Sequence, residues 1–339
     1  MKIHKIITSL LFLFVLTISM YSQDKRTLDT KVADLLALFP ADDLSYTDKL
    51  MNDMLLLGEE GIKKICDQII PAGTGDDTQA RFAIESFSRF LSQPGKEPEK
   101  KMWEHICIQY VTTKKDNTVK DFFMKQLQLV GGDNAIEAMK TFFMDKANCE
   151  PAIAVIYSIG SKSAEAVLSS SLKNRDFSCP AAAMNALARM QSENAVDEFI
   201  FWSASPNLEI RASAFNALAQ SGSPKAYPIL LKAAKNTGYK WDKTGVVNAL
   251  LNYAKRTGEK GDLKTSDAIS KTLISKCKDK SNMHYKTAAL KTYVNFHGFG
   301  AMPYLLKAAK DPDTKYRNSA LRMSLELPEN EVTKSWIDF

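Results

Sequence analysis

Residues 226–235 read AYPILLKAAK and residues 301–310 read AMPYLLKAAK, so eight of the ten positions are identical. Neither copy contains an acid, a histidine, a cysteine or a serine. The aliphatic residues recur with the period of an α-helix, and lysines occupy the opposite side. Such a helix is suited to packing rather than to catalysis, so its duplication predicts a repeated helical architecture.

Small residues recur along the chain at a nearly constant spacing. The first series is Ala152, Ala183, Ala214, Val246, Ala289 and Ala320, with spacings of 31 or 32 residues and one of 43. Four residues after each member come Ile156, Leu187, Leu218, Leu250, Tyr293 and Ser324, the last slipping to Leu325. A second pair of series comprises Ala164, Ala195, Ala226, Ala268, Ala301 and Val332, followed by Leu168, Phe199, Leu230, Thr272, Leu305 and Trp336. Because residues four apart share a helix face, each unit is predicted to be two short helices that bury their apolar faces by stacking.

Glycines mark the expected turns between the paired helices. Gly131, Gly160 and Gly222 each lie where a first helix should end, and glycine readily takes the left-handed conformation of a helix C-terminus. Ser223 and Asn134 follow these turns and are predicted to cap the second helices.

One segment, IRASAFNALAQSGSPKAYPILLKAAK (residues 210–235), carries a family pattern. Its matching elements are Ile210-Arg211, Ala214, Ala217-Leu218, Gly222, Pro224, Ala226 and Leu230-Leu231, and Tyr285-Lys286 and Tyr316-Arg317 repeat the apolar-basic opening after acidic turns such as Asp311 and Asp313. The segment resembles a HEAT repeat of the short type found in phycobilisome-lyase-like proteins. This resemblance implies an all-α fold, an α-α superhelix of HEAT/ARM type. No chromophore-handling residue accompanies the repeats, so lyase activity is not implied. We expect divergent helical repeats over residues 23–145 and regular repeats over residues 146–339.

The order of segments resembles the N-terminal half of large secreted bacterial proteins. In those proteins an export signal and short HEAT repeats precede a β-sandwich similar to 3-keto-disaccharide hydrolases. No strand-rich segment occurs in this sequence, which stops at SWIDF, one turn into a second helix. A solenoid normally ends in a polar cap, whereas Trp336, Ile337 and Phe339 are apolar. We therefore expect the regular repeats to be truncated at the C-terminus.

The first 22 residues are predicted to be a secretory signal peptide. Lys2 and Lys5 precede an uncharged run over residues 6–20, which is shorter than the roughly 20 residues that span a membrane. Ser22 is the best small residue for cleavage, and the alternative is an uncleaved N-terminal anchor. The first cysteine is Cys66, so no lipid-bearing cysteine can follow the signal. We expect an exported protein, periplasmic or extracellular, with no stable membrane span after cleavage.

The charge of the chain argues against a nucleic-acid partner. The formal net charge is +6, of which Lys2 and Lys5 contribute two charges. A nucleic-acid binder would be expected to concentrate basic residues in a stripe, which the sequence lacks.

No catalytic or metal-binding constellation is apparent. The five cysteines, Cys66, Cys107, Cys149, Cys179 and Cys277, form no C-x-x-C pair, and the four histidines are scattered. We therefore predict no cofactor, no metal and no catalytic residue. Cys149 and Cys179 begin first helices of adjacent repeats, so a disulfide is possible only where those helices converge to about 7 Å; otherwise both stay free.

Three features are candidates for partner binding. Ten extra residues fall between Leu250 and Ala268, in a predicted turn that carries Lys255, Arg256, Lys260 and Lys264. Lys232, Lys235, Lys307 and Lys310 lie opposite the core side of second helices, which we expect to line a concave groove. Asn185, Asn216 and Asn248 recur beside the core series and either bond the backbone of a neighbouring turn or form an exposed polar ladder. Arg211, Lys243, Lys286 and Arg317 are expected to pair with acidic turns. For each charged set, the alternative is a merely solvated surface.

These features favour a non-catalytic scaffold or protein-binding module whose partner is a protein or a glycan. The alternative function is a targeting or accessory region of a secreted carbohydrate-active hydrolase whose catalytic domain lies beyond residue 339.

Overall fold

The computed structural model describes residues 26–41 and 43–339, and every regular element within them is a helix. The predicted signal peptide, residues 1–22, lies outside the described residues. None of the helices in the described ranges is both long and apolar enough to span a membrane. The chain divides into two compact units, Met1–Ile106 and Cys107–Phe339. The predicted boundary after residue 145 marks where the repeats become regular, and it stays a prediction.

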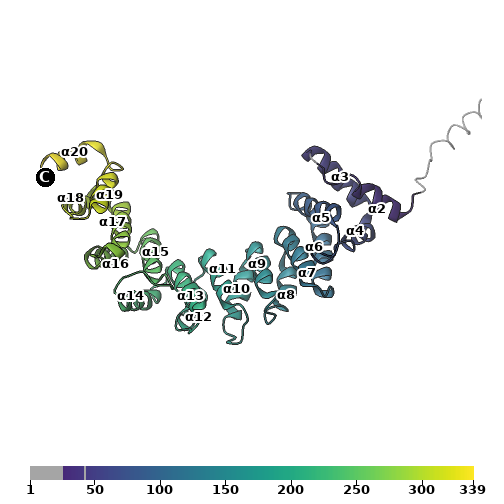
Figure 1. Cartoon of the computed structure of the whole chain (residues 1–339), viewed down its shortest axis with the longest axis horizontal. Helices are drawn as coiled ribbons and strands as arrows, with labels where there is room; N and C mark the ends of the chain where they lie inside the picture. The colour runs from purple at the N-terminus through teal and green to yellow at the C-terminus, as the bar shows by residue number, and fades with distance from the viewer. Residues whose placement is uncertain (1–25, 42) are drawn as a thin grey trace, which may run out of the picture. The chain divides into compact units, whose positions relative to one another are not determined.

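The first unit packs four helices and the start of a fifth around its own core (Figure 1). The helices are α2 (Leu28–Leu36), α3 (Leu44–Leu56), α4 (Gly58–Cys66), α5 (Thr78–Leu91) and α6 (Glu97–Thr113), the last running across the boundary. Met51, Met54, Ile62 and Ile65 have no exposed surface. Cys66, the last residue of α4, is buried as well.

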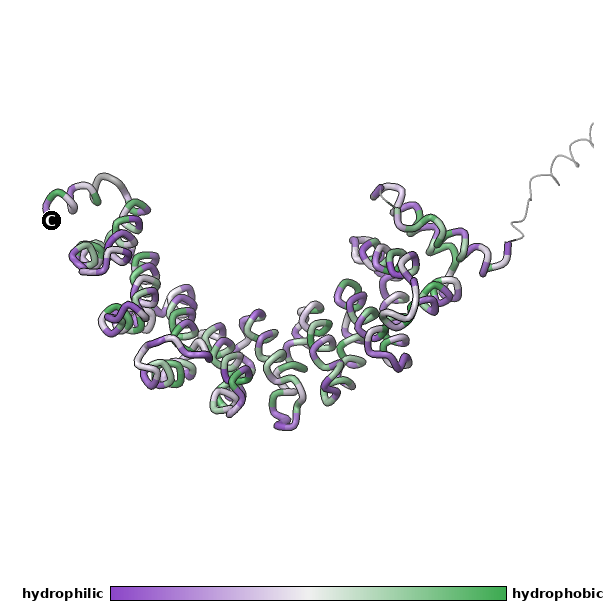
Figure 2. Tube along the Cα trace, in the orientation of Figure 1, coloured by the Kyte–Doolittle hydropathy of each residue, from purple (hydrophilic) through white to green (hydrophobic). Residues whose placement is uncertain are grey.

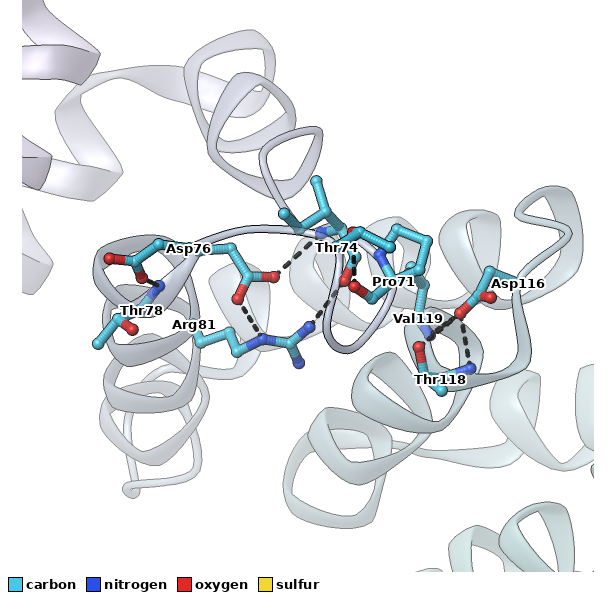
Figure 3. A network of polar contacts seen from close by, with 10 residues as sticks. Pro71, Thr74, Asp76, Thr78, Arg81, Asp116, Thr118 and Val119 are labelled. Carbon is cyan, nitrogen blue, oxygen red and sulfur yellow. Dashed lines mark hydrogen bonds and ion pairs between the residues drawn. The ribbon is translucent and has the colours of Figure 1, made fainter.

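A polar network ties down the loop between α4 and α5 (Figure 3). Asp77 accepts hydrogen bonds from the Ile70 amide (3.0 Å) and from Arg81 Nε (2.6 Å), and Arg81 also donates to the Ile70 carbonyl (2.9 Å). Burial raises the pKa of Asp77, but these hydrogen bonds outweigh burial and hold the pKa below its ordinary value. The loop is therefore fixed by a charged centre rather than by apolar packing.

The second unit is a row of stacked helical hairpins, which confirms the predicted all-α solenoid. After α7 (Asn117–Val130) and α8 (Asp133–Lys140) come six first helices, α9 (Cys149–Ile159), α11 (Pro180–Arg189), α13 (Leu208–Ser221), α15 (Val246–Glu259), α17 (Met283–His297) and α19 (Thr314–Ser324). Their second helices are α10 (Lys162–Ser171), α12 (Val196–Trp202), α14 (Ala226–Asn236), α16 (Leu263–Lys276), α18 (Met302–Ala309) and α20 (Glu329–Ile337). Short 3-10 helices, η1 (Lys280–Asn282) and η2 (Gly298–Ala301), precede α17 and α18.

Within this unit, first and second helices occupy opposite sides of a curved row. Figure 1 shows α9, α11, α13, α15, α17 and α19 on the inner side, and α10, α12, α14, α16 and α18 on the outer side. We call these sets the inner helices and the outer helices. Hydrophobic and hydrophilic residues alternate along each helix of the unit (Figure 2), as a two-sided packing arrangement requires.

The predicted small-residue series forms the core of the second unit. Ala152, Ala183, Ala214, Val246, Ala289 and Ala320 have no exposed surface. Two predicted positions are wrong. The series ends on Ser324, which is buried, rather than on Leu325, which is 83% exposed. On α16 the buried pair is Ile269 and Leu273, one residue beyond the predicted Ala268 and Thr272.

The turn glycines fulfil two of the three expectations. Gly160 and Gly222 end α9 and α13 in the left-handed region, with φ of 63° and 62°. Gly131 is extended instead, and a Cβ there would lie 2.5 Å from the Leu127 carbonyl oxygen, so close approach explains this glycine.

Neither predicted side-chain cap forms. Ser223 is buried before the start of α14, and Asn134 is the second residue of α8. On α10, the cap is Ser161, whose hydroxyl accepts from the Ala164 amide.

The ten extra residues do not form a loop after Leu250, which corrects that prediction. Helix α15 continues to Glu259 and α16 begins at Leu263, so only a short turn separates them. The long connection instead covers residues 237–245, before α15. The reason is an offset: Val246 is the first residue of α15, whereas Ala214 and Ala289 are each the seventh residue of their helices.

A disulfide joins two successive inner helices. Cys149 is the first residue of α9 and Cys179 caps α11, and their Cα atoms lie 6.2 Å apart. That separation is within the range that a disulfide requires. The helix starts converge here, which is the condition that the sequence left open.

Candidate functional site

Three successive inner helices each carry one asparagine of the predicted ladder. Asn185 and Asn216 lie five and six residues before the C-caps of α11 and α13, whereas Asn248 lies twelve residues before the C-cap of α15. Asn185 on α11 and Asn248 on α15 are exposed, and Asn216 on α13 is half-buried. Among residues 26–41 and 43–339, none of these three side chains has a hydrogen-bond partner. The expectation that they bond the backbone of a neighbouring turn is therefore wrong, and the three amides are left without partners, as the alternative of an exposed polar ladder requires.

The ladder arises from the packing of the inner helices. Helices α11, α13 and α15 contact one another in succession, and each buries the positions that flank its asparagine. On α13, for example, Phe215 and Ala217 are buried on either side of Asn216. The apolar neighbours fix each backbone. Asn248 is not level with Asn216, because the end of α13 at Gly222 lies against Arg256 and Lys260 at the end of α15.

Farther along the chain, a hollow of about 1340 Å³ opens between the inner helices α17 and α19. Its walls come from η1, the first half of α17, the connection between α18 and α19, and the start of α19. The charged or titratable residues that line it are Lys278, Lys280, His284, Lys286, Lys291, Asp311, Asp313 and Lys315. Apolar surface comes from Met283, Ala288, Pro312 and Met323.

The acidic residues of this basic hollow are already engaged. Asp311 forms an ion pair with Lys286, whose side chain is only 11% exposed, and also accepts from the Asp313 amide at 3.0 Å. Asp313 caps α19 by accepting from the Tyr316 amide at 2.8 Å. Burial raises the pKa of Asp311, but the bonds from Lys286 and from the Asp313 amide outweigh burial and lower the pKa overall. Both carboxylates are thus structural, as expected for acidic turns.

The remaining lysines are available to a ligand. Lys278, Lys280 and Lys315 are exposed, and none of them forms an ion pair in the described part of the chain. The neighbouring Asp279 pairs with Lys240 instead. Lys291 pairs with Glu326, whose side chain is 62% exposed. Exposed ion pairs of that kind contribute about 0 to 1 kcal/mol, so a competing carboxylate could displace Glu326 at little cost.

The lysines predicted to line a concave groove lie elsewhere. Lys232 and Lys235 belong to α14, and Lys307 belongs to α18, with Lys310 directly after it. All four are exposed, but α14 and α18 are outer helices (Figure 1), so the expected concave placement is wrong. Lys310 lies over the Phe339 ring, with its Nζ 3.9 Å from the ring centroid. Binding by these lysines stays a prediction.

Three of the four predicted residues near the α15–α16 turn contact neighbouring residues of the fold. Lys260 pairs with Glu193 at 2.5 Å, reaching the turn that precedes α12. Arg256 packs its stem over Gly222 and lies 4.0 Å from Glu259, which also pairs with Lys255 at 3.8 Å. Lys264 is exposed in the first turn of α16. Because the expected loop does not exist, these residues do not gather on one.

Of the basic residues predicted to pair with acidic turns, one forms the predicted ion pair. Lys286 forms the expected ion pair with an acidic turn, whereas Arg317 donates to the backbone carbonyls of Asp311 and Pro312. Arg211 likewise donates to the Ser205 carbonyl. The sequence therefore pointed to Lys286, Asp311 and Asp313 but not to the hollow that they line, because η1 and the α18–α19 connection are far apart in the chain.

The described residues do not suggest a reaction. No three His, Cys, Asp or Glu side chains among them converge as metal ligands. Burial raises the pKa of the Cys277 thiol to about 11, so this cysteine stays protonated and unreactive near neutral pH. His297 contacts Asp267, with Nε2 and Oδ1 2.6 Å apart, at the end of α17.

Comparisons with known proteins agree with the solenoid. A family model described as HEAT repeats matches residues 165–251. The crystal structure of a Kap121p mutant superposes with a TM-score of 0.55 at 12% identity, covering 94% of this chain and 40% of the other. An engineered protein from the Northeast Structural Genomics Consortium reaches a TM-score of 0.35 at 16% identity, covering 91% of this chain and 81% of that protein. None of the curated proteins matches. The fold is an all-α HEAT/ARM-like solenoid, and the chain spans well under half of the Kap121p mutant.

Proposed function

We propose that the chain is an exported, non-catalytic HEAT-repeat scaffold that binds a partner protein along the inner helices of its second unit. The observation that carries this proposal is the ladder of Asn185, Asn216 and Asn248. Each of the three amides lies on a successive inner helix between buried neighbours, and none has a partner in the described part of the chain.

The ladder suits an extended protein segment. Each asparagine offers two donors and an acceptor, so it can bond both the carbonyl and the amide of a partner backbone. Protein interfaces rely on such spaced hydrogen bonds within a packed surface. Solenoids present surfaces of this kind because successive repeats place equivalent residues side by side.

Export is supported by two independent features. The N-terminal basic and apolar run has the pattern of a secretory signal. The Cys149–Cys179 disulfide suits an oxidising compartment, since structural disulfides are rare in the cytosol. The partner would then be a periplasmic or extracellular protein. An accessory role beside a carbohydrate-active hydrolase, and a glycan partner, stay predictions.

The test of the scaffold compares inner and outer surfaces. The inner variant is Asn185→Ala with Asn216→Ala and Asn248→Ala, and the control is Ser170→Ala with Asn236→Ala and Ser275→Ala on outer helices. Wild type and both variants are used to capture proteins from periplasmic and extracellular extract, with identification by mass spectrometry. We expect the inner variant to lose a protein that wild type and control both recover. Identical recovery by all three would contradict the proposal.

Export has its own test. The protein is isolated from separated cell fractions, and its free thiols are alkylated before and after reduction. We expect the exported fraction to gain two alkylated sites, Cys149 and Cys179, only after reduction. Protein confined to the cytosol with both thiols free would contradict export.

A further inference from the structure

We propose that the basic hollow between α17 and α19 is the docking site for an acidic segment of the partner protein, with apolar residues interspersed among its carboxylates. This inference rests on the proposed function, because α17 and α19, which border the hollow, belong to the same set of inner helices as α11, α13 and α15. The proposed function says where a partner protein binds, and this inference adds which chemical groups of the partner are recognised.

Charge complementarity is the first argument. Five lysines and two aspartates line the hollow, and both aspartates are engaged within the fold. Lys278, Lys280 and Lys315 remain exposed and have no acidic partner in the described ranges. Like charges that gather around one concavity repel one another, and an anionic ligand relieves that repulsion. A carboxylate-bearing segment is therefore the expected occupant.

The basic residues of the lining are five lysines and His284, with no arginine among them. Arginine offers a planar fork that binds carboxylate and phosphate groups alike in a bidentate manner, whereas lysine is a point charge on a flexible stem. The lining therefore imposes no fixed bidentate geometry, and it can meet several carboxylates at varied positions, as an acidic peptide presents them.

The size and the apolar floor argue for a peptide rather than a small molecule. The volume of about 1340 Å³ exceeds the roughly 300–1,000 Å³ of typical small-molecule pockets. Met283, which is half-buried, and the exposed Ala288 and Pro312 contribute apolar surface, and Met323 beneath them belongs to the core. Methionine adapts its shape to varied side chains, so apolar residues of the segment can settle there while its carboxylates reach the rim.

The experiment measures binding of a defined probe to two matched variants. The probe is a fluorescently labelled peptide of repeated Glu-Ala-Glu-Leu units, and a second peptide has Gln in place of each Glu. The hollow variant is Lys278→Glu with Lys280→Glu and Lys315→Glu. The control variant, Lys232→Glu with Lys235→Glu and Lys307→Glu, makes the same charge change on the outer helices. Fluorescence anisotropy gives Kd at low and at physiological salt, and circular dichroism checks the fold.

We expect the hollow variant to lose about tenfold or more in affinity for the acidic peptide, since each exposed ion pair contributes a factor of roughly 1.4 to 5. The control variant should bind within about twofold of wild type, because its lysines lie outside the hollow. The Gln peptide should bind weakly to all three proteins. Added salt should weaken wild-type binding more than binding by the hollow variant.

Several outcomes would overturn the inference. Equal loss in the hollow and control variants would show that only net charge matters. Equal affinity of wild type for the Glu and Gln peptides would show that carboxylates are not recognised. Binding of a sulfated polysaccharide, without binding of the acidic peptide, would assign the hollow to a glycan. If the charge reversals disturb the fold, Lys→Gln at the same three positions provides the neutral variant.

The outcome separates this inference from the scaffold proposal. Capture of a partner that depends on the amide ladder, together with no binding of the acidic peptide, would leave the scaffold intact and refute the hollow. Peptide binding that depends on the hollow, without any captured protein that depends on the three asparagines, would support the hollow and refute the scaffold proposal.

Discussion

Ala214 shows how tightly single residues are constrained in this solenoid. It has no exposed surface, and its helix α13 packs against both α11 and α15. Ala214→Leu adds three carbon atoms where the helices are closest, so we expect the free energy of unfolding to fall by about 1 to 3 kcal/mol. Thermal denaturation followed by circular dichroism measures the change. Ala212→Leu, on the partly exposed side of the same helix, serves as the control, and equal melting temperatures for the two variants would contradict the packing.

The Lys286–Asp311 pair makes the end of the row sensitive to acid. Because the folded-state pKa of Asp311 is below its ordinary value, the pair stabilises the fold above the usual carboxyl pKa of about 4. That contribution is lost as the pH falls through the lower, folded-state pKa.

The corresponding variant is Asp311→Asn, which leaves the mostly buried Lys286 ammonium without its counter-ion. We expect the free energy of unfolding at neutral pH to fall by about 1 to 3 kcal/mol. We also expect the variant to lose less further stability than wild type between pH 5 and the acid limit. Urea titrations at several pH values measure both effects. Parallel pH profiles for wild type and variant would argue against the pair as the source.

At the scale of elements, the disulfide is the strongest constraint between neighbouring hairpins. It closes a segment with a sequence separation of 30 residues that contains α9 and α10. In the chain-entropy description, a loop of that length stabilises the fold by about 3 to 4 kcal/mol. We expect Cys149→Ser with Cys179→Ser to unfold at lower urea, and reductant to destabilise wild type but not the double variant. An effect of reductant on both proteins would point to another cause.

Helix periodicity could be predicted from the sequence, whereas helix ends could not. The buried series succeeded because stacked helices require small residues at fixed contacts, as at Ala183 and Ala289. The offset at α15 was missed because Val246 is an apolar residue that fits the small-residue series as well as a residue from the middle of the helix would. Ser223 is not the cap because α14 begins only at Ala226, with Lys225 at the N-cap, and the Ala226 amide donates to the Ser223 backbone carbonyl at 2.9 Å.

The candidate sites were less predictable than the fold. The recurrence of asparagine could be seen in the sequence, but whether these side chains have hydrogen-bond partners depends on where the structure places them. The basic hollow joins η1, α17 and the start of α19, and no local pattern links Lys280 to Lys315. The side of the row on which α14 and α18 lie depends on curvature, which short-range periodicity does not encode.

At the scale of the whole molecule, the two compact units each have their own core. Ile62→Ala removes buried apolar volume from the first unit and should cost about 2 to 5 kcal/mol. We expect faster amide hydrogen exchange in α2 to α5, with exchange in α13 to α19 unchanged. Hydrogen exchange with mass spectrometry measures this, with Ala214→Leu as the reciprocal control. Equal acceleration along the entire chain would show that the units unfold as one.

The covalent link between α9 and α11 also has a mechanical meaning. A row of hairpins behaves as a spring, because each joint can open a little when the ends are pulled apart. The joint between these two hairpins is locked by a bond, so extension must come from the joints that rely on packing alone, such as that between α13 and α15. Reduction would free the locked joint and soften the spring. The compliance of this protein under load would thus report the redox state of its surroundings.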